Sequence, residues 1–277
     1  MGNNQISPVS VRQSFGQDRE QCQRWLLQFR PNPSAALQLF CFPYAGVGGS
    51  AFFPWVGALP ASIELQAVQL PGREGRMRER PLEQISAIVP FVADAIRARV
   101  DRAYAFFGHS MGALLAFEVA RQLRSGGFPG PVHLFASARR APHRPDRLPE
   151  IRHLPDGEFL EALRRRWDGI PAAVLREPEL LQLLMASLRA DVAVIETYTY
   201  IDGESLACPI SVYGGEGDNS IEREDLLSWK EMTSGLFRLR MFPGNHFFIR
   251  TQYQDVIHAV IEDLLPVLGP CRGAAPC

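Results

Sequence analysis

The feature that most constrains the fold is a five-residue turn, Gly108-His109-Ser110-Met111-Gly112, which joins two opposite kinds of sequence pattern. The apolar run from Ala103 to Phe107 precedes the turn and is typical of a buried strand. A helical pattern follows from Gly112 to Leu123, with apolar residues at spacings of three and four. The chain must therefore adopt a fold in which a strand turns sharply into a helix around a serine.

Other short apolar runs alternate with helical patterns along the chain. Five further runs indicate strands: Leu37 to Phe42, Ile63 to Gln69, Val132 to Ala136, Ile210 to Tyr213 and Leu236 to Phe242. Between them, apolar residues from Ile85 to Ile96 recur at helical spacing. Strands that alternate with helices are typically parallel and joined by right-handed crossovers. We therefore expect an α/β fold with a mostly parallel central sheet and helices on both faces.

One long segment, about residues 141–200, interrupts this alternation. It contains no convincing strand, and its two helical stretches run from Asp156 to Arg166 and from Pro178 to Thr197. An all-helical insertion of this length predicts a lid over the functional site. The alternative is a pair of ordinary crossover helices.

The remaining sequence predicts one domain with loosely held ends. The 277 residues are 46% apolar, which is enough to build one large core over residues 36–268. Residues 1–35 are polar and predict a lead-in with one short helix around Gln21 to Phe29. The Gly/Pro/Ala-rich residues 269–277 predict a flexible tail.

Composition argues against several classes of protein. The formal net charge of -1 gives no support to non-specific nucleic-acid binding. No apolar run approaches the roughly 20 residues of a membrane helix, and the polar start lacks the apolar centre of a signal peptide. The five cysteines include no CxxC pair and suggest reduced thiols. We expect a cytoplasmic monomer with no cofactor, no metal, and no nucleic-acid or membrane partner.

A serine in this strand–turn–helix context is the nucleophile of enzymes with the α/β-hydrolase fold. Flanking glycines leave room for the tight turn, and the helix N-terminus favours negative charge beside Ser110. A serine hydroxyl needs a base, which an acid in turn orients. In this fold the acid follows the serine along the chain and the histidine comes last. The sequence therefore predicts a serine hydrolase with a helical lid and Ser110 as its nucleophile.

The best candidate for the base is His246. It lies in the glycine-containing loop Pro243-Gly244-Asn245-His246, directly after a late predicted strand. The other five histidines occupy the serine turn, a strand start, the lid region or the last helix: His109, His133, His143, His153 and His258. We predict that His246 is the general base.

The best candidate for the acid is Asp218, which ends the turn after the predicted strand from Ile210 to Tyr213. Glu216 is its local competitor. Three other carboxylates are weaker candidates, because Asp225 is expected on the exposed side of a helix and Asp191 and Asp202 belong to the lid region.

Two backbone N–H groups are predicted to stabilise the oxyanion. The first belongs to Met111, which follows the nucleophile at the start of the helix. The second comes from the glycine-rich loop after the first core strand, Phe42 to Ser50, where the N–H of Ala45 is our choice.

Six segments together resemble the type II thioesterases that accompany modular polyketide and nonribosomal peptide synthetases, and the resemblance covers about Leu39 to Leu264. The segments are Phe42-Pro43-Tyr44-Ala45-Gly46, Leu70-Pro71-Gly72-Arg73-Glu74, Gly108-His109-Ser110-Met111-Gly112, Arg139-Arg140-Ala141-Pro142, Leu188-Arg189-Ala190-Asp191 and Phe242-Pro243-Gly244-Asn245-His246-Phe247-Phe248. Val47 and Asn245 depart from the family pattern, which usually has glycine at both positions. Val47 is expected to affect the shape of the oxyanion loop, whereas asparagine tolerates left-handed backbone.

The resemblance implies a substrate and a partner. The substrate is an acyl group held as a thioester on the phosphopantetheine arm of an acyl or peptidyl carrier protein. The implied role is editing, in which aberrant or stalled acyl units are hydrolysed so that the assembly line can resume.

Two further sets of residues are hypotheses about substrate and partner. Carrier proteins are usually acidic, and residues 139–152 carry a basic stretch: Arg139, Arg140, His143, Arg144, Arg147 and Arg152. We predict that Arg144 and Arg147 dock the carrier; the alternative is a solvated loop. The acyl chain is predicted to contact four lid residues, Leu181, Leu184, Met185 and Leu188, which instead pack lid against core in the alternative interpretation.

Three other functions share parts of this pattern. An esterase or lipase acting on free oxygen esters would use the same triad. A thioesterase that releases the finished product is usually fused to a synthetase, and this chain shows no attached carrier domain. A non-catalytic carrier-binding protein would not need Ser110, Asp218 and His246 together.

Overall fold

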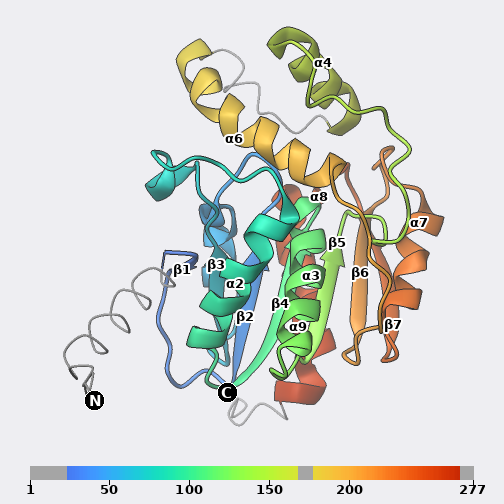
Figure 1. Ribbon diagram of the computed structural model, residues 1–277. Helices are drawn as coiled ribbons and strands as arrows, with labels where there is room; N and C mark the ends of the chain where they lie inside the picture. The colour runs from blue at the N-terminus through green and yellow to red at the C-terminus, as the bar shows by residue number, and fades with distance from the viewer. Residues whose placement is uncertain (1–23, 168–176, 269–277) are drawn as a thin grey trace, which may run out of the picture.

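A seven-stranded sheet forms the centre of the protein in the computed structural model, which describes residues 24–167 and 177–268 (Figure 1). The strand order is β1-β3-β2-β4-β5-β6-β7, and all neighbouring strands are parallel except the β1–β3 pair. The strands are β1 (Leu26–Gln28), β2 (Leu37–Phe42), β3 (Ile63–Val68), β4 (Ala103–His109), β5 (His133–Ser137), β6 (Ile210–Gly215) and β7 (Phe237–Phe242). The predicted mostly parallel sheet is confirmed.

Helices cover both faces of the sheet. Along β4 the side chains alternate between the faces, so Phe106 and Phe107 belong to different apolar clusters. The Phe106 face is covered by α2 (Ile85–Arg99), α3 (Met111–Ser125) and α7 (Arg223–Leu227). The Phe107 face is covered by the 3-10 helix η1 (Gly49–Gly57), α8 (Phe248–Thr251) and α9 (Tyr253–Leu268). This two-faced burial explains why a central strand such as β4 reads as a nearly continuous apolar run.

The sheet begins earlier in the chain than expected. Residues Leu26–Gln28 pair antiparallel with β3, so the helix predicted around Gln21 to Phe29 is wrong where the structure describes it. The side chains of Trp25 and Leu26 are buried, and the Trp25 ring stacks on Phe91 of α2. Edge pairing and this burial override the local helical pattern. The rest of the expected lead-in and the expected tail lie outside the described residues.

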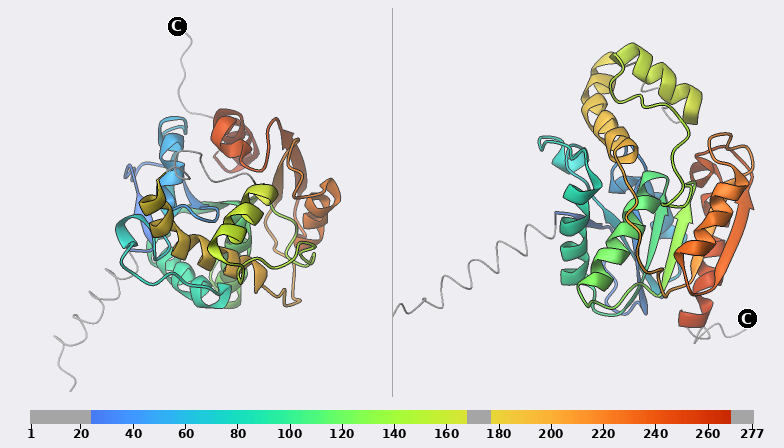
Figure 2. Two further views of the ribbon diagram at one scale, coloured as in Figure 1. Left: turned by 90° about the horizontal axis from the view of Figure 1, so that it is seen from above. Right: turned by 45° about the vertical axis from the view of Figure 1, so that its right-hand side comes forward.

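Two helices lie across the carboxyl ends of the strands rather than on a face of the sheet (Figures 1 and 2). They are α4 (Asp156–Trp167) and α6 (Pro178–Glu196), and they connect β5 to β6. Their facing side chains form a small apolar cluster of their own around Phe159, Leu163 and Leu188. Toward its C-terminal end, α6 also packs on the main core through Val194 and Ile195. The α4–α6 pair therefore covers the edge at which parallel α/β sheets place their functional residues.

Two further expectations concern the described residues alone. None of their helices is long and apolar enough to cross a membrane. Cys41 and Cys208 are both free thiols, and the other cysteines lie outside the described residues.

Candidate active site

Ser110 occupies the junction between β4 and α3, and its backbone is strained. Its φ of 54° and ψ of −117° place a residue other than glycine at positive φ. The two flanking glycines have no room for a side chain. A Cβ on Gly108 would lie 2.2 Å from the Gly112 carbonyl oxygen, and a Cβ on Gly112 would lie 2.0 Å from that of Phe42. The glycines of the motif are therefore required by close backbone contacts, which hold Ser110 at the tip of the turn.

His246 reaches Ser110 from the loop after β7. Its Nε2 lies 3.0 Å from the Ser110 Oγ, and its side chain is almost fully buried. The backbone N–H of Gly217 donates to the Gly244 carbonyl at 2.8 Å, which fastens the loop of His246 to the loop after β6. The structure thus brings together two residues that are 136 positions apart.

Asp218, in the loop after β6, completes the chain of hydrogen bonds. Its Oδ2 lies 2.7 Å from the His246 Nδ1. Its Oδ1 accepts from the backbone N–H of Ser220 at 2.9 Å and from the Ser220 hydroxyl at 2.6 Å. Burial alone would raise the pKa of Asp218, but the hydrogen bonds from His246 and Ser220 outweigh it and lower the pKa below its usual value. An ionised Asp218 only accepts, so Nδ1 of His246 carries the proton and Nε2 is free to accept from Ser110.

The competing carboxylates lie elsewhere. Glu216 is exposed on the same loop as Asp218. Asp225 was expected to be exposed, and this is wrong: it is 2% exposed, since Arg140 and Arg147 surround its carboxylate at 4.0 and 3.8 Å. Asp191 lies on α6 and is wholly buried against an arginine. Sequence reasoning did not identify Ser220 as the residue that holds Asp218, although a serine two positions after an aspartate is a known turn signal.

A second buried Ser–His–Asp cluster lies near the start of β5 and β6. The His133 Nε2 is 2.9 Å from the Ser211 Oγ, which donates to the Asp263 carboxylate at 2.6 Å. Here the serine hydroxyl donates its hydrogen bond to the aspartate, so it donates none to the histidine. Burial lowers the pKa of His133 to about 4. This cluster joins strands to α9 and lacks the order that activates a serine.

His109 is buried beside the candidate site. Its Nδ1 lies 2.8 Å from the Ser137 Oγ, and its ring packs against Tyr44 and His246. Burial lowers the pKa of His109 well below its usual value, so the ring is neutral. It forms part of the wall behind His246 and is not positioned as the base.

The two predicted oxyanion donors lie on adjacent elements. Met111 is the first residue of α3, where helix N–H groups have no partner within the helix. Ala45 lies in the loop that follows β2, and the Gly112 contact with Phe42 packs that loop against the start of α3. The φ of Val47 is not positive, because Gly46 carries the left-handed conformation at φ 82°. The loop therefore accommodates Val47 without backbone strain.

Side chains of the segment after β3 form hydrogen bonds with the end of the glycine-rich loop that follows β2, a role that the sequence did not predict. The Gln69 Oε1 accepts from the Gly49 N–H at 2.8 Å, and the Glu74 carboxylate accepts from the Ser50 hydroxyl. Glu74 itself has a φ of 47°. The Glu74 contact gives a physical reason for the last residue of the Leu-Pro-Gly-Arg-Glu segment, which carried part of the family resemblance.

Asn245 has a different role from the one expected. The left-handed residue of its loop is Gly244, at φ 117°, and Asn245 is not at positive φ. Its Oδ1 accepts from the Phe247 N–H at 3.0 Å. The asparagine side chain thus stabilises the turn that carries His246.

The four apolar residues predicted to contact substrate lie along α6. Leu188 is buried, and its Cδ1 would lie 2.9 Å from a Cβ on Gly46. Met185 packs at the edge of the α4–α6 cluster, whereas Leu181 and Leu184 are half-buried. Trp167, at the end of α4, was not predicted; its ring lies 6.2 Å from that of His246. Leu188 and Trp167 thus approach the candidate site from the two helices.

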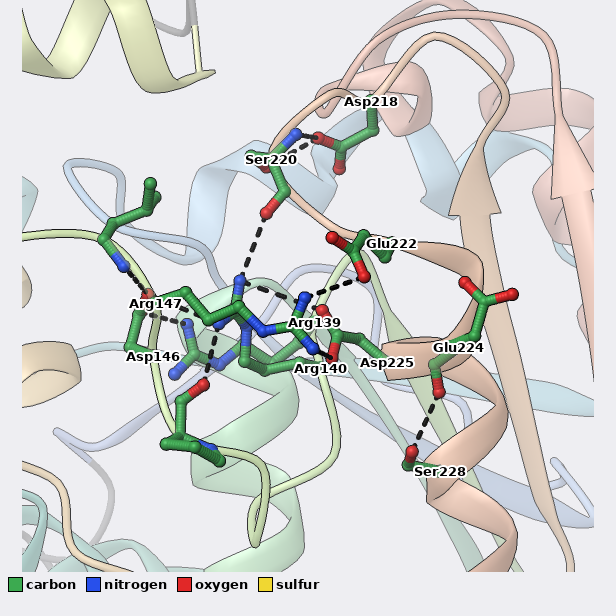
Figure 3. A network of polar contacts seen from close by, with 12 residues as sticks. Arg139, Arg140, Asp146, Arg147, Asp218, Ser220, Glu222, Glu224, Asp225 and Ser228 are labelled. Carbon is green, nitrogen blue, oxygen red and sulfur yellow. Dashed lines mark hydrogen bonds and ion pairs between the residues drawn. The ribbon is translucent and has the colours of Figure 1, made fainter.

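The basic stretch is largely neutralised (Figure 3). Arg139 and Arg140 are buried around Asp146, and Arg147 forms an ion pair with Glu222 at 2.7 Å. The side chain of Arg144 is exposed and makes no ion pair with another described residue. Arg140 also donates to the Ser220 carbonyl at 3.2 Å, which links this stretch to the loop of Asp218.

The combined geometry is suited to nucleophilic acyl transfer. A buried histidine lies within hydrogen-bond distance of the serine hydroxyl, and an aspartate with a lowered pKa bonds its other ring nitrogen. Helix α3 begins at the residue after the serine, and a helix N-terminus favours negative charge.

Comparison with known proteins gives consistent matches. The family model described as a thioesterase domain matches residues 37–265. The gramicidin S biosynthesis protein GrsT of Aneurinibacillus migulanus is 41% identical over 90% of this chain and 97% of its own length. The thioesterase PikA5 of Streptomyces venezuelae is 36% identical over 88% of this chain and 87% of its own.

A solved structure agrees with these sequences. The type II thioesterase BorB from the borrelidin biosynthetic cluster superposes with a TM-score of 0.78 at 35% identity, covering 87% of this chain and 97% of that one.

Proposed function

This chain belongs to the thioesterase family, and from that premise we propose that it hydrolyses acyl thioesters held on the phosphopantetheine arm of a carrier protein. The observation that carries the proposal is the hydrogen-bonded series Ser110–His246–Asp218 at the carboxyl edge of the sheet. Membership of the family supports a thioester as the substrate, and this hydrogen-bonded series supports Ser110 as an activated nucleophile.

The proposed mechanism follows from the atoms in contact. His246 accepts the proton of Ser110 at Nε2 while the serine oxygen attacks the thioester carbonyl. The N–H groups of Met111 and Ala45 stabilise the oxyanion, and the protonated His246 gives its proton to the departing pantetheine thiol. A water molecule then gives a proton to the same nitrogen as it attacks the acyl carbonyl, and His246 returns that proton to the departing Ser110 oxygen, which releases the free acid. Asp218 stabilises the imidazolium throughout and stays ionised.

The biosynthetic role is proposed from the relatives. GrsT is named for gramicidin S biosynthesis and BorB for the borrelidin cluster, which supports work beside a nonribosomal peptide or polyketide assembly line. We propose that the enzyme removes aberrant or stalled acyl groups from the carriers of such a line. The carrier protein is then its partner.

A direct comparison of substrates tests the thioester specificity. The enzyme is expected to hydrolyse an acyl group on a carrier's pantetheine with a kcat/KM more than about tenfold above that for the matched oxygen ester. Steady-state assays of both substrates, over a series of acyl lengths, measure this. Faster turnover of the oxygen ester at every length would identify an esterase and contradict the proposal.

We also propose that the acyl chain lies between α6 and the loop after β2. Leu188 supports this position because it touches Gly46, next to the candidate oxyanion donor Ala45. Met185, Leu184 and Leu181 continue along the same helix away from Ser110 and would contact progressively longer chains.

Carrier docking at Arg144 and Arg147 remains a proposal, and the structure ranks the two residues. Arg144 is exposed and can meet an acidic partner directly, whereas Arg147 would have to exchange Glu222 for that partner. Exposed charges at the rim of an interface act mainly on association.

Charge reversal tests the docking. Arg144→Glu is expected to lower kcat/KM for acyl-carrier by about fivefold, through KM, with a smaller effect from Arg147→Glu. Neither variant should change turnover of a small acyl-pantetheine thioester. Equal losses on both substrates, or no loss from Arg144→Glu on the carrier, would refute docking at this position.

A further inference from the structure

A buried ion pair joins α6 to the core beside the candidate oxyanion loop. The guanidinium of Arg73, just after β3, donates to both carboxylate oxygens of Asp191 on α6, at 2.6 and 2.8 Å. The two side chains are 3% and 0% exposed. A paired, planar contact of this kind fixes orientation as well as distance.

Both members of the pair also bind the backbone next to Ala45. The Asp191 Oδ2 accepts from the Gly46 N–H at 2.8 Å, and the Arg73 Nη1 donates to the Val47 carbonyl at 3.3 Å. The Gly46 N–H belongs to the peptide group that follows Ala45. It is joined through the Cα of Ala45 to the peptide group that carries the Ala45 N–H, so anchoring it limits the orientations open to that N–H.

A second contact from α6 falls on the same residue. Leu188 lies three positions before Asp191, so the two side chains share one face of the helix. Leu188 packs on Gly46 closely enough that an added Cβ would clash with it. The position of α6 and the conformation of Gly46 are thereby tied together.

We propose that Arg73 and Asp191 are positioning residues that hold the Ala45 N–H toward the oxyanion. The geometry of the oxyanion hole then depends on the position of α6 against the core. The inference rests on the proposed function of the same site. The pair does not touch the reacting atoms and acts through the backbone of Gly46 and Val47. Because the oxyanion forms only during reaction, loss of the pair should lower kcat and leave KM nearly unchanged.

The alternative is a purely structural tie between α6 and the core. Loss of such a tie would lower stability without changing the chemistry of the enzyme that remains folded. A buried aspartate near the start of β6, whose partner Arg240 is 31% exposed, provides the control. Asp263 of α9 is buried and pairs with Arg240 at 2.8 Å, at the opposite edge of the sheet from Ser110.

The test compares Asp191→Ala, Asp191→Asn and Asp263→Asn. We expect Asp191→Ala to lower kcat for a small acyl-pantetheine by about ten- to a hundredfold, with KM changed less than about twofold. Asp191→Asn keeps an acceptor for the Gly46 N–H and should recover part of the loss. Asp263→Asn should lose stability in chemical denaturation while its kcat stays at the wild-type value.

Inhibitor binding provides a second measurement. An alkyl trifluoromethyl ketone, which forms an oxyanion on Ser110, should bind Asp191→Asn more weakly in step with the loss of kcat. A non-hydrolysable thioether analogue should bind as it does to the wild type. Unchanged kcat in folded Asp191→Asn and Asp191→Ala, or equal weakening of both ligands, would overturn the inference. Inactive wild-type enzyme would instead refute the proposed function.

Discussion

Ser110→Ala is expected to lower kcat/KM for acyl thioesters by about four to six orders of magnitude. The change removes the proposed attacking oxygen, while the proposed oxyanion donors and substrate contacts remain. The small residual rate would come from those contacts alone. The effect is measured in steady-state assays on acyl-pantetheine, with mass spectrometry to show that the acyl-enzyme no longer forms.

The protein offers a matched control for this loss. Ser211 lies in the other buried Ser–His–Asp cluster, bonded to His133 and Asp263. Ser211→Ala should cost stability and retain the wild-type kcat. Full hydrolysis by Ser110→Ala would contradict the proposed nucleophile and revive a non-catalytic, carrier-binding role for this surface.

Asp218→Asn should lower kcat by about four orders of magnitude, although the change is nearly isosteric. The ionised carboxylate accepts from Nδ1–H of His246 and so leaves Nε2 without a proton. An amide can instead donate to Nδ1, which favours the ring tautomer protonated at Nε2. That tautomer cannot take the proton of Ser110.

Glu216→Gln is the control for Asp218→Asn, because Glu216 is exposed and lies two positions earlier in the same loop. We expect it to keep near wild-type kcat. Since the pKa of Asp218 is lowered, activity between neutral pH and mild acid should reflect groups other than this carboxyl. Equal losses of kcat in Asp218→Asn and Glu216→Gln would mean that the conformation of the loop, and not the Asp218 carboxylate, determines activity.

The sequence was most informative where local chemistry decides the structure. The strand of Leu37–Phe42 was predicted with its observed bounds, since burial on both faces leaves a run that is apolar at every position but Gln38. The turn at Ser110 was identifiable because only glycine fits at Gly108 and Gly112. Asp218 and His246 could be predicted because each lies in a loop after a predicted strand, and a parallel sheet places such loops at one edge.

Contacts between residues that are far apart in the chain could not be predicted from the local sequence pattern. Asp225 resembles any helical surface carboxylate until Arg140 and Arg147 are placed beside it. The strand at Leu26–Gln28 is short and forms only because β3 offers a free edge. Likewise, Arg73 and Asp191 are 118 positions apart, and although each belongs to a family-like segment, no sequence pattern paired them.

The small apolar cluster between α4 and α6 is separate from the two clusters that hold the sheet. Substitutions there, for example at Phe159 or Leu163, can accumulate without repacking the strand that presents Ser110. If the acyl chain lies against α6 as proposed, we expect related enzymes to diverge in the acyl groups they accept while they keep the same chemistry. Leu188 is the exception, because it packs in this cluster and also contacts Gly46 in the loop after β2.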